Sequence, residues 1–327
     1  MFLVTGGAGF IGSNVVASLN EVGATDVVVS DLLGRDDAKS RNLAKHQVTD
    51  LVPPTELARW LGSRKLDAVI HMGAISDTTV TDGDLVMENN FRLSMRLLDW
   101  CTATRTPFVY ASSAATYGDG SQGFDDDGSL DALRKLKPMN LYGWSKHLFD
   151  LAVVDRHAKK EKMPPHWVGL KFFNVYGPNE YHKGHMASIV AKVFDIAKAG
   201  QPVRLFKSHR EGIADGDQRR DFIYVDDAIS VLRWFLEASG ISGIFNVGTG
   251  KAESFRDMIA AMFKALHLPV SIEYIDMPEA IRRQYQYFTE ARVEHLRGAG
   301  YNGGFTPLDA AVGQYVAGYL NRQDRYR

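Results

Sequence analysis

The stretch FLVTGGAGFIGSN (residues 2–14) places a short apolar run directly before four glycines, at positions 6, 7, 9 and 12. Residues 7–12 of this stretch, GAGFIG, fit the pattern G-x-G-x-x-G. Between a strand and a helix, such glycines let the backbone turn tightly and approach a pyrophosphate, whose charge then lies at the helix N-terminus. The pattern alone is also compatible with a simple tight turn, so the neighbouring sequence has to decide.

The sequence after the glycines favours a nucleotide site. An amphipathic segment follows them, and a second β-branched run, DVVVSD (residues 26–31), ends in Asp31, 19 residues after Gly12. A carboxylate at about this separation accepts hydrogen bonds from the ribose of a bound dinucleotide. The opening of the chain therefore predicts a dinucleotide site that includes Gly6, Gly9, Gly12 and Asp31.

The choice between NAD and NADP stays open at this level. Asp31 favours NAD, because its carboxylate would repel the 2′-phosphate of NADP. Three cations follow closely, Arg35, Lys39 and Arg41, and they could compensate for that repulsion.

Short apolar runs alternate with longer amphipathic segments along the first half of the chain. Strands are expected at residues 2–5, 26–31, 67–74, 107–113 and 166–174, and helices at 13–22, 85–101 and 142–159. The alternation predicts an α/β fold with a Rossmann-type, doubly wound parallel sheet. After about Asn174 the rhythm loosens; helices are expected at 187–198, 228–238 and 254–265, a late strand at 243–248, and a surface loop at 209–218.

Two parts of unequal size are expected. The first is a dinucleotide-binding Rossmann domain of residues 1–173 plus parts of about 221–250. The second is a smaller substrate-binding domain of residues 174–220 and 251–327. Ligands commonly enter clefts between such parts.

The bulk composition excludes several kinds of partner. The chain has 327 residues and a formal net charge of −1, so no electrostatic argument favours nucleic acid or an anionic membrane surface. Its one cysteine, Cys101, cannot form an intramolecular disulfide, which fits a reducing compartment. Neither a signal peptide nor a membrane-spanning run is evident, and a cytoplasmic protein is expected.

A second motif, YGWSK (residues 142–146), carries chemistry. If it begins a helix, Tyr142 and Lys146 lie one turn apart on the same face. A neighbouring ammonium lowers the pKa of a phenol and makes the tyrosinate accessible as a base. Ser113, at the end of a predicted strand, could share a substrate hydroxyl proton with Tyr142. An isolated pair of this kind is more often a surface tyrosine and lysine, but here it follows a nucleotide motif.

Five stretches together resemble the extended short-chain dehydrogenase/reductase family, in the branch that modifies nucleotide sugars: TGGAGFIGSN, YASSAATYG, YGWSK, KFFNVYGP and RRDFIYVDD. The match extends over nearly the whole chain. Three further stretches, NVYGPNEYHKGHMAS, SGIFNVGTGKAESF and YQYFT, resemble the epimerases of that branch that act on ADP-heptoses. This resemblance implies inversion of an exocyclic carbinol carbon, in the synthesis of the lipopolysaccharide inner core.

The chemistry implied by the resemblance needs two proton carriers. A carbinol C–H without an adjacent carbonyl is too weak an acid to be removed directly, so the carbon is first oxidised to a ketone, with Tyr142 accepting the hydroxyl proton. Rotation about one C–C bond then presents the opposite face for hydride return. Because rotation moves the oxygen away from Tyr142, a second acid/base is needed, and the resemblance assigns this role to Lys183.

Lys183 lies between two histidines, in YHKGH (residues 181–185). A lysine exchanges protons near neutral pH only if burial or a nearby positive charge lowers its pKa. The ordinary alternative is a solvated loop lysine. The flanking His182 and His185 have no further ligands at metal-site spacing, so no metal is expected.

Other roles follow from the resemblance alone. It places the cofactor against these residues: Gly6, Gly9, Phe10, Ile11, Gly12, Asp31, Leu32, Lys39, Met72, Gly73, Ala74, Ile75, Ser76, Asn89, Lys146, Val175 and Lys183. It places the ADP-sugar against these: Ser113, Asn174, His185, Lys192, Phe206, Lys207, Ser208, His209, Arg220 and Tyr285. Lys39 would contact a 2′-phosphate, so the resemblance favours NADP, tightly bound, over NAD. Arg220 could hold a phosphate or form an ion pair with Asp221 or Asp226.

Three alternatives remain. A nucleotide-sugar dehydratase would carry an Asp-Glu pair after the strand-end serine, where this chain has Ala114 and Ala115. A hexose 4-epimerase would not require Lys183. A non-catalytic NADP-binding sensor or scaffold would be expected to lack the pair of Tyr142 and Lys146. The resemblance also implies a homo-oligomer, and specifically a pentamer.

Overall fold

The computed structural model describes residues 1–238, 240–282 and 285–327. Its main sheet has seven parallel strands in the order β10-β6-β5-β4-β1-β2-β3. The strands are β1 (Phe2–Thr5), β2 (Val27–Ser30), β3 (Asp50–Val52), β4 (Ala68–His71), β5 (Phe108–Ser113), β6 (Trp167–Phe172) and β10 (Gly243–Val247). The doubly wound parallel sheet expected from the sequence is therefore confirmed. The switch in strand order beside β1 is where ligands bind in such sheets.

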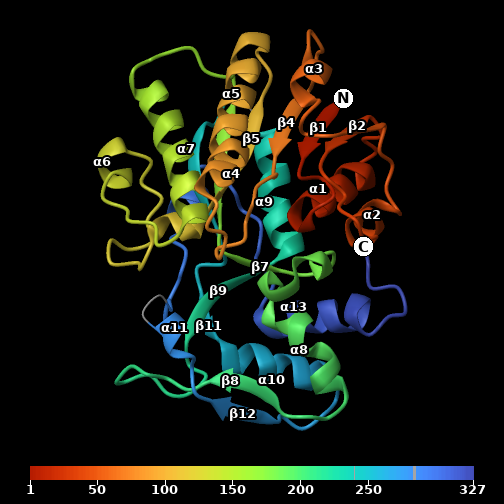
Figure 1. The fold of residues 1–327 in the computed structure, drawn as a ribbon, viewed down its shortest axis with the longest axis vertical. Helices are drawn as coiled ribbons and strands as arrows, with labels where there is room; N and C mark the ends of the chain where they lie inside the picture. The colour runs from red at the N-terminus through yellow and green to blue at the C-terminus, as the bar shows by residue number, and fades with distance from the viewer. Residues whose placement is uncertain (239, 283–284) are drawn as a thin grey trace.

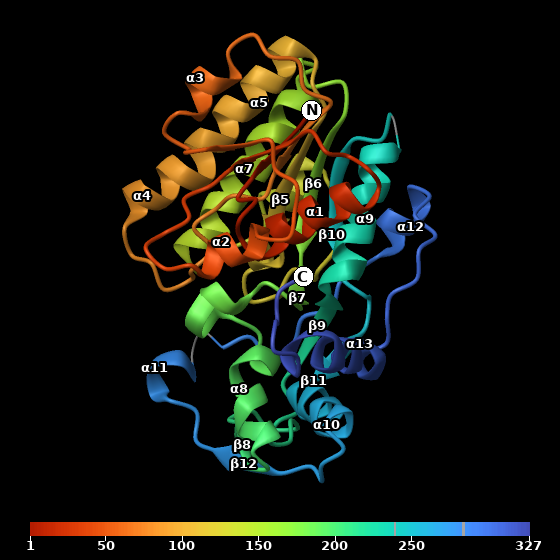
Figure 2. The same cartoon turned by 90° about the vertical axis from the view of Figure 1, so that its right-hand side faces the viewer.

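Helices cover both faces of this sheet (Figures 1 and 2). On one face lie α1 (Phe10–Glu21), α2 (Ala38–Leu43) and α9 (Val225–Glu237). On the other lie α3 (Leu57–Leu61), α5 (Leu93–Thr104) and α7 (Leu141–Ala158). Neighbouring residues of one strand serve opposite faces, because Leu3 packs with the second set of helices and Val4 with the first.

A smaller part lies below the carboxyl ends of the main strands (Figure 1). It contains a three-stranded sheet of β11 (Ala252–Ser254), β9 (Arg219–Tyr224) and β7 (Asn174–Tyr176), and a two-stranded sheet of β12 (Ile272–Ile275) and β8 (Val203–Phe206). Its helices are α8 (Ile189–Lys198), α10 (Phe255–Ala265), α11 (Glu279–Arg282) and α13 (Leu308–Tyr315). Helices α10 and α13 pack against each other.

Several short elements connect these parts. They are α4 (Gly83–Met87), a π-helical turn (Glu88–Arg92), a 3-10 turn (Ala114–Tyr117), α6 (Leu130–Leu133), a 3-10 segment (Tyr181–Met186), α12 (Glu294–Gly298) and a final π-helical turn (Val316–Leu320). The helix expected at 85–101 is thus interrupted and extends to Thr104. Helix α1 begins at Phe10 rather than at residue 13, because the glycine motif forms its first turn. No helix of the described ranges is long and apolar enough to cross a membrane.

Candidate active site

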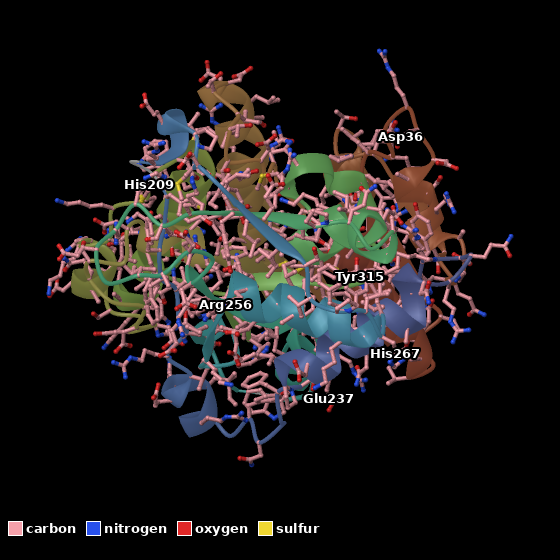
Figure 3. The ribbon with its side chains drawn as sticks, turned by 90° about the horizontal axis from the view of Figure 1, so that it is seen from below. Asp36, His209, Glu237, Arg256, His267 and Tyr315 are labelled. Carbon is pink, nitrogen blue, oxygen red and sulfur yellow. The ribbon has the colours of Figure 1, made fainter. Side chains whose placement is uncertain are left out.

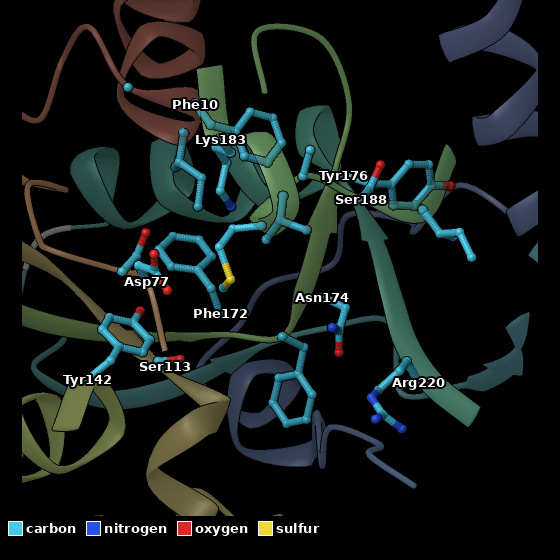
Figure 4. A pocket seen from close by; sticks show the side chains of 18 of the residues that line it. Phe10, Asp77, Ser113, Tyr142, Phe172, Asn174, Tyr176, Lys183, Ser188 and Arg220 are labelled. Carbon is cyan, nitrogen blue, oxygen red and sulfur yellow. The ribbon is translucent and has the colours of Figure 1, made fainter. Parts of the chain in front are cut away.

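A cavity of about 1010 Å³ lies between the carboxyl ends of the main strands and the smaller part. Its walls come from six regions distant in sequence: the glycine motif, Asp31 with Lys39, the strand ends of β4 to β6, the start of α7, the segment from Asn174 to Val193, and the smaller part from Arg204 to Tyr285. Figure 4 shows Tyr142 and Ser113 on one side of it, Lys183 on another, and Asn174 with Arg220 at a third. Such a volume accommodates a large ligand.

The glycine motif forms the cofactor end of the cavity. Gly6 has φ +65°, and a Cβ there would lie 2.5 Å from the Cα of Gly73, so only glycine fits. A Cβ on Gly12 would lie 2.1 Å from the carbonyl oxygen of Gly6. Helix α1 begins after Gly9, and no side chain caps its first turn. The backbone therefore forms a close-fitting cradle for a pyrophosphate at a helix N-terminus.

Asp31 closes the same end of the cavity. Its carboxylate accepts hydrogen bonds from the backbone N–H groups of Ala8 (3.0 Å) and Leu32 (2.7 Å), and from Lys39 Nζ (2.9 Å). Both Asp31 and Lys39 line the cavity. One carboxylate and one ammonium therefore lie side by side at the position where the ribose of a dinucleotide would lie.

Most of the residues expected at the cofactor line the cavity, including Met72 to Ser76 and Val175. Two do not. Leu32 is 61% exposed and points to solvent. Asn89 donates its side-chain amide to the carbonyl of Leu85 and faces a different groove.

Its neighbour Asn90 was not expected from the sequence, yet it supports the cavity wall. The buried Asn90 side chain accepts a hydrogen bond from the N–H of Ile75 (2.8 Å) and donates to the carbonyl of Ile75 (2.9 Å). It also donates to Ser145 Oγ (3.0 Å), next to Lys146. The sequence ENN (residues 88–90) has two adjacent asparagines, and it does not indicate which of the two side chains faces inward.

Tyr142, Ser113 and Lys146 line one side of the cavity, where β5 ends and α7 begins. Asn140 caps α7 by accepting a hydrogen bond from the N–H of Gly143, so Tyr142 and Lys146 lie one turn apart at the start of that helix. Burial raises the pKa of Tyr142, and a hydrogen bond with the Ser113 side chain opposes this shift. Burial lowers the pKa of Lys146 to about 8, and its Nζ donates to the carbonyl of Ala111 (2.7 Å).

Beneath this wall lies a buried ion pair that the sequence analysis missed. Lys171 Nζ lies 2.7 Å from Asp150 Oδ2, and the side chains are 1% and 0% exposed. Asp150 also accepts hydrogen bonds from Tyr110 (3.1 Å) and Ser112 (2.7 Å). Its charge opposes the effect of burial on the pKa of Lys146. In the sequence, only the spacing of one helical turn between Lys146 and Asp150 indicates that the carboxylate lies near the tyrosine–lysine pair.

Lys183 lies at the third wall, in the 3-10 segment. Its Nζ lies 5.4 Å from the centre of the Phe10 ring, and burial lowers its pKa. It therefore points into the cavity rather than into bulk solvent (Figure 4). The neighbouring His182 also lines the cavity, and burial lowers its pKa to about 4, so it is neutral near pH 7.

The far end of the cavity carries an arginine. Arg220 is 7% exposed; its guanidinium lies 5.4 Å from the centre of the Tyr285 ring and 5.7 Å from that of Phe255. Neither of the two expected carboxylate partners engages it. Asp221 accepts hydrogen bonds from the N–H groups of Thr249, Gly250 and Ala291, and Asp226 pairs with Arg327. The Arg220 guanidinium donates to the carbonyls of Arg219 (2.8 Å) and Gln286, but among the described residues no ion pair contains it, so no carboxylate neutralises its charge.

The substrate residues expected from the sequence divide into two sets. Ser113, Asn174, Lys192, Phe206, Arg220 and Tyr285 line the cavity. His185, Lys207, Ser208 and His209 do not. His185 lies beside Asp77 at 3.5 Å, and Lys207 pairs with Asp276 at 3.5 Å. His209 (labelled in Figure 3) follows β8 and is exposed, and its N–H donates to the hydroxyl of Tyr287 (3.0 Å).

The geometry defines a class of protein: a Rossmann-type fold with a dinucleotide cradle, a tyrosine–lysine pair and a second lysine around one cavity. Residues 2–248 match the family described as "NAD dependent epimerase/dehydratase family". The chain belongs to this family.

Relatives extend over the whole chain. An ADP-L-glycero-D-manno-heptose-6-epimerase of Nitratidesulfovibrio vulgaris is 48% identical over 332 residues, covering 100% of both chains. One of Fusobacterium nucleatum is 44% identical over 336 residues, again covering 100% of both. The crystal structure of the Helicobacter pylori ADP-L-glycero-D-manno-heptose-6-epimerase superimposes with a TM-score of 0.80 at 29% identity, covering 97% of this chain and 95% of that one.

Proposed function

We propose that the protein epimerises ADP-D-glycero-D-manno-heptose to ADP-L-glycero-D-manno-heptose with NADP as cofactor. The observation that carries this proposal is that Tyr142 and Lys183 line one cavity from different sides, with the dinucleotide cradle at its end (Figure 4). The names of the relatives support the substrate. A hexose 4-epimerase inverts a ring carbon and does not need the second carrier.

The two carriers have separate tasks. Tyr142 accepts the proton of the exocyclic hydroxyl while the carbon becomes a ketone; when bound, the nicotinamide supplies the chemistry of taking up and returning the hydride. Rotation of the sugar arm then turns the carbonyl oxygen toward Lys183, which donates a proton as the carbon is reduced from its other face. No net oxidation results.

Tyr142 needs help to act as a base at neutral pH, because burial raises its pKa. The Ser113 side chain bonds its hydroxyl, and the ammonium of Lys146 stands one turn further along α7. Both favour the tyrosinate. Lys183 is prepared in the opposite sense, since burial lowers its pKa toward the range where a lysine exchanges protons.

Substrate orientation is assigned to the far end of the cavity. Arg220 would hold the diphosphate of the ADP-sugar, and the rings of Phe206 and Tyr285 would pack against the nucleoside. Elimination is disfavoured because Ala114 and Ala115 stand where a dehydratase carries its acid and base. A non-catalytic scaffold would have no need for two half-buried proton carriers around one cavity.

Several finer features belong to the same proposal. Lys39 beside Asp31 supports NADP over NAD, and the close fit of the glycine cradle supports tight retention of the cofactor. The dinucleotide part would consist of residues 1–173 with parts of 221–250, and the remainder would bind substrate. The product would serve the lipopolysaccharide inner core, in the cytoplasm, with the enzyme acting as a homo-oligomer such as a pentamer.

The direct experiment is to incubate the protein and NADP with ADP-D-glycero-D-manno-heptose and to follow the epimer by NMR. We expect both epimers at equilibrium, with no net change in the cofactor. If the heptose is returned unchanged while a UDP-hexose is converted at its ring carbon, the proposal is wrong and the 4-epimerase alternative holds.

A further inference from the structure

The loop that carries Lys183 is closed by a buried carboxylate. This loop, residues 177–188, is called the Lys183 loop below. Glu180 within it is 1% exposed. Its carboxylate accepts hydrogen bonds from the N–H of Gly177 (3.2 Å) and from the N–H (2.5 Å) and Oγ (2.7 Å) of Ser188. One side chain thus joins the beginning and the end of the loop.

The same carboxylate attaches the loop to the smaller part. Tyr315 of α13 donates its hydroxyl to Glu180 Oε1 (3.1 Å). Ser188 in turn caps α8, because its Oγ accepts a hydrogen bond from the N–H of Ala191 (3.3 Å). Two helices of the smaller part are therefore held to the loop through Glu180.

On its other side the loop is attached to α1. Asn14 donates to the carbonyl of Pro178 (3.0 Å), and Asn179 donates to Ser13 Oγ (3.0 Å). Helix α1 begins at Phe10, the residue whose ring lies below Lys183 Nζ. The loop therefore has one anchor at the dinucleotide cradle and another at Glu180, with Lys183 between them.

Glu180 also acts on two lysines that line the cavity. Burial raises its own pKa, and the hydrogen bonds from Ser188 and Gly177 oppose that shift and favour its charged form. Burial lowers the pKa of Lys183 and of Lys192, and the charge of Glu180 opposes both shifts. None of the ion pairs among the described residues joins Glu180 to either lysine, so it acts on them at longer range. The other titratable groups around Glu180 are Tyr176, Tyr181 and Tyr315, and His182 lies beside Lys183.

We propose that Glu180 is a positioning residue for the second proton carrier: by joining both ends of the Lys183 loop to α13, it holds the Lys183 ammonium over Phe10 and toward the substrate. This inference rests on the proposed function of Lys183. It assigns to Glu180 no contact with substrate or cofactor, because the carboxylate is turned away from the cavity into the loop.

The test compares Glu180→Gln with the wild type in two measurements. Epimerisation is followed by NMR, and the apparent pKa of each lysine is obtained by competitive acetylation and mass spectrometry across pH. We expect kcat to fall at least about tenfold and the pKa values of Lys183 and Lys192 to fall, because the charge that opposes the effect of burial is removed. The pKa of Lys146, on another wall, should not change and serves as the internal reference. Wild-type kcat in Glu180→Gln overturns the inference, whatever the lysine titration shows.

Matched variants separate loop closure from general damage. Glu161→Gln makes the same chemical change at an exposed position after α7 and should alter neither measurement. Tyr315→Phe removes one hydrogen bond to Glu180 without removing charge, so kcat should fall less and the pKa of Lys183 should stay. If Glu180→Gln does not fold, Tyr315→Phe carries the test, and wild-type kcat in that variant contradicts the inference.

Lys183→Met distinguishes this inference from the proposed function. An active Lys183→Met variant removes the second carrier and with it the function proposed above. An inactive Lys183→Met variant beside a fully active Glu180→Gln variant leaves the function intact and removes only the role of Glu180.

Discussion

Lys39 Nζ lies 2.9 Å from Asp31 Oδ1, with Asp31 only 9% exposed at its side chain. The pair places a positive charge beside the one carboxylate that would otherwise repel a 2′-phosphate. It leaves that carboxylate able to accept a hydrogen bond from a ribose hydroxyl. This salt bridge therefore joins the carboxylate that favours NAD to the ammonium that favours NADP, and the sequence alone left that choice open.

Lys39→Ala should change the choice of cofactor. Loss of a charge-assisted hydrogen bond costs about 1.5–3 kcal/mol, so NADP should bind about ten- to a hundredfold more weakly. NAD, which lacks the 2′-phosphate, should lose little affinity. Calorimetric titration with both cofactors measures the ratio. The control is Arg41→Ala, because Arg41 stacks on Tyr326 instead. Equal weakening of both cofactors in Lys39→Ala would contradict the role given to Lys39.

Gly12→Ala should close the cradle. The added Cβ would lie 2.1 Å from the carbonyl oxygen of Gly6, which is backbone and cannot move aside cheaply. We expect loss of measurable cofactor binding and a lower melting temperature. Gly313→Ala is the matched control: a Cβ there meets nothing within 4 Å, and alanine in helix α13 should stabilise the protein by about 0.5–1 kcal/mol. Cofactor binding by Gly12→Ala at wild-type affinity would show that the motif does not hold the pyrophosphate.

Asp150→Asn should destabilise the protein strongly. It removes the charge that compensates Lys171 in a fully buried pair, and breaking such a pair costs about 3–5 kcal/mol. Urea unfolding measures the loss. The double variant Asp150→Leu/Lys171→Met leaves no unpaired charge and should lose less than Asp150→Asn alone. If the double variant is less stable than Asp150→Asn, the ion pair stabilises the fold by more than the neutralisation of its own two charges.

Much of the fold follows from pattern. Strands buried on both faces are continuous apolar runs, and these runs predicted β1, β2, β4, β5 and β6 to within a few residues. The short strands β7, β8, β9, β11 and β12 were not predicted. They are three to six residues long, and their pairing joins segments far apart in the chain, so no local pattern marks them.

The site divides in the same way. The tyrosine–lysine spacing on α7 and the glycine turn are local geometry, and local sequence predicts them. Asn89 and Asn90 are adjacent in a helical turn and point in different directions, so a shift of one residue exchanges a solvent-facing amide for a buried one. From the sequence, Glu180 is an ordinary loop carboxylate. Its role depends on the contact with Tyr315, 135 residues away, which only the fold creates.

The pH dependence of the reaction should follow Lys146. Burial lowers its pKa to about 8, so its charge is present below that pH and is lost as pH rises through it. Tyrosinate formation at Tyr142 then loses the positive charge that favours it, and kcat should decline above about pH 8. Stability moves the other way: between about pH 8 and 10.5 the unfolded chain binds more protons at this lysine, so the free energy of unfolding should rise with pH.

Lys146→Arg tests that assignment. Arginine stays charged to much higher pH, so the decline near pH 8 should disappear from the rate profile, whatever the loss in absolute rate. A profile in Lys146→Arg with the same decline near pH 8 would assign it to another group, of which Lys183 is the first to test by the acetylation measurement.

The two proton carriers should be equally indispensable. Tyr142→Phe and Lys183→Met each remove one carrier, and general acid–base catalysis contributes about 10²–10⁴-fold, so each variant should lose at least a hundredfold in kcat. Both should keep their fold: the phenyl ring remains in Tyr142→Phe, and methionine fills the space of the Lys183 stem over Phe10. Circular dichroism and melting temperature check this.

The need for both carriers applies to both directions of the reaction. If each carrier serves one face of the ketone, every epimerisation must use both, in either direction. Each variant should therefore be impaired whether it is given the D- or the L-glycero epimer, as NMR of both reactions measures. A Lys183→Met variant with full activity would mean that Tyr142 serves both faces alone, and the sugar arm would then have no second partner to turn toward.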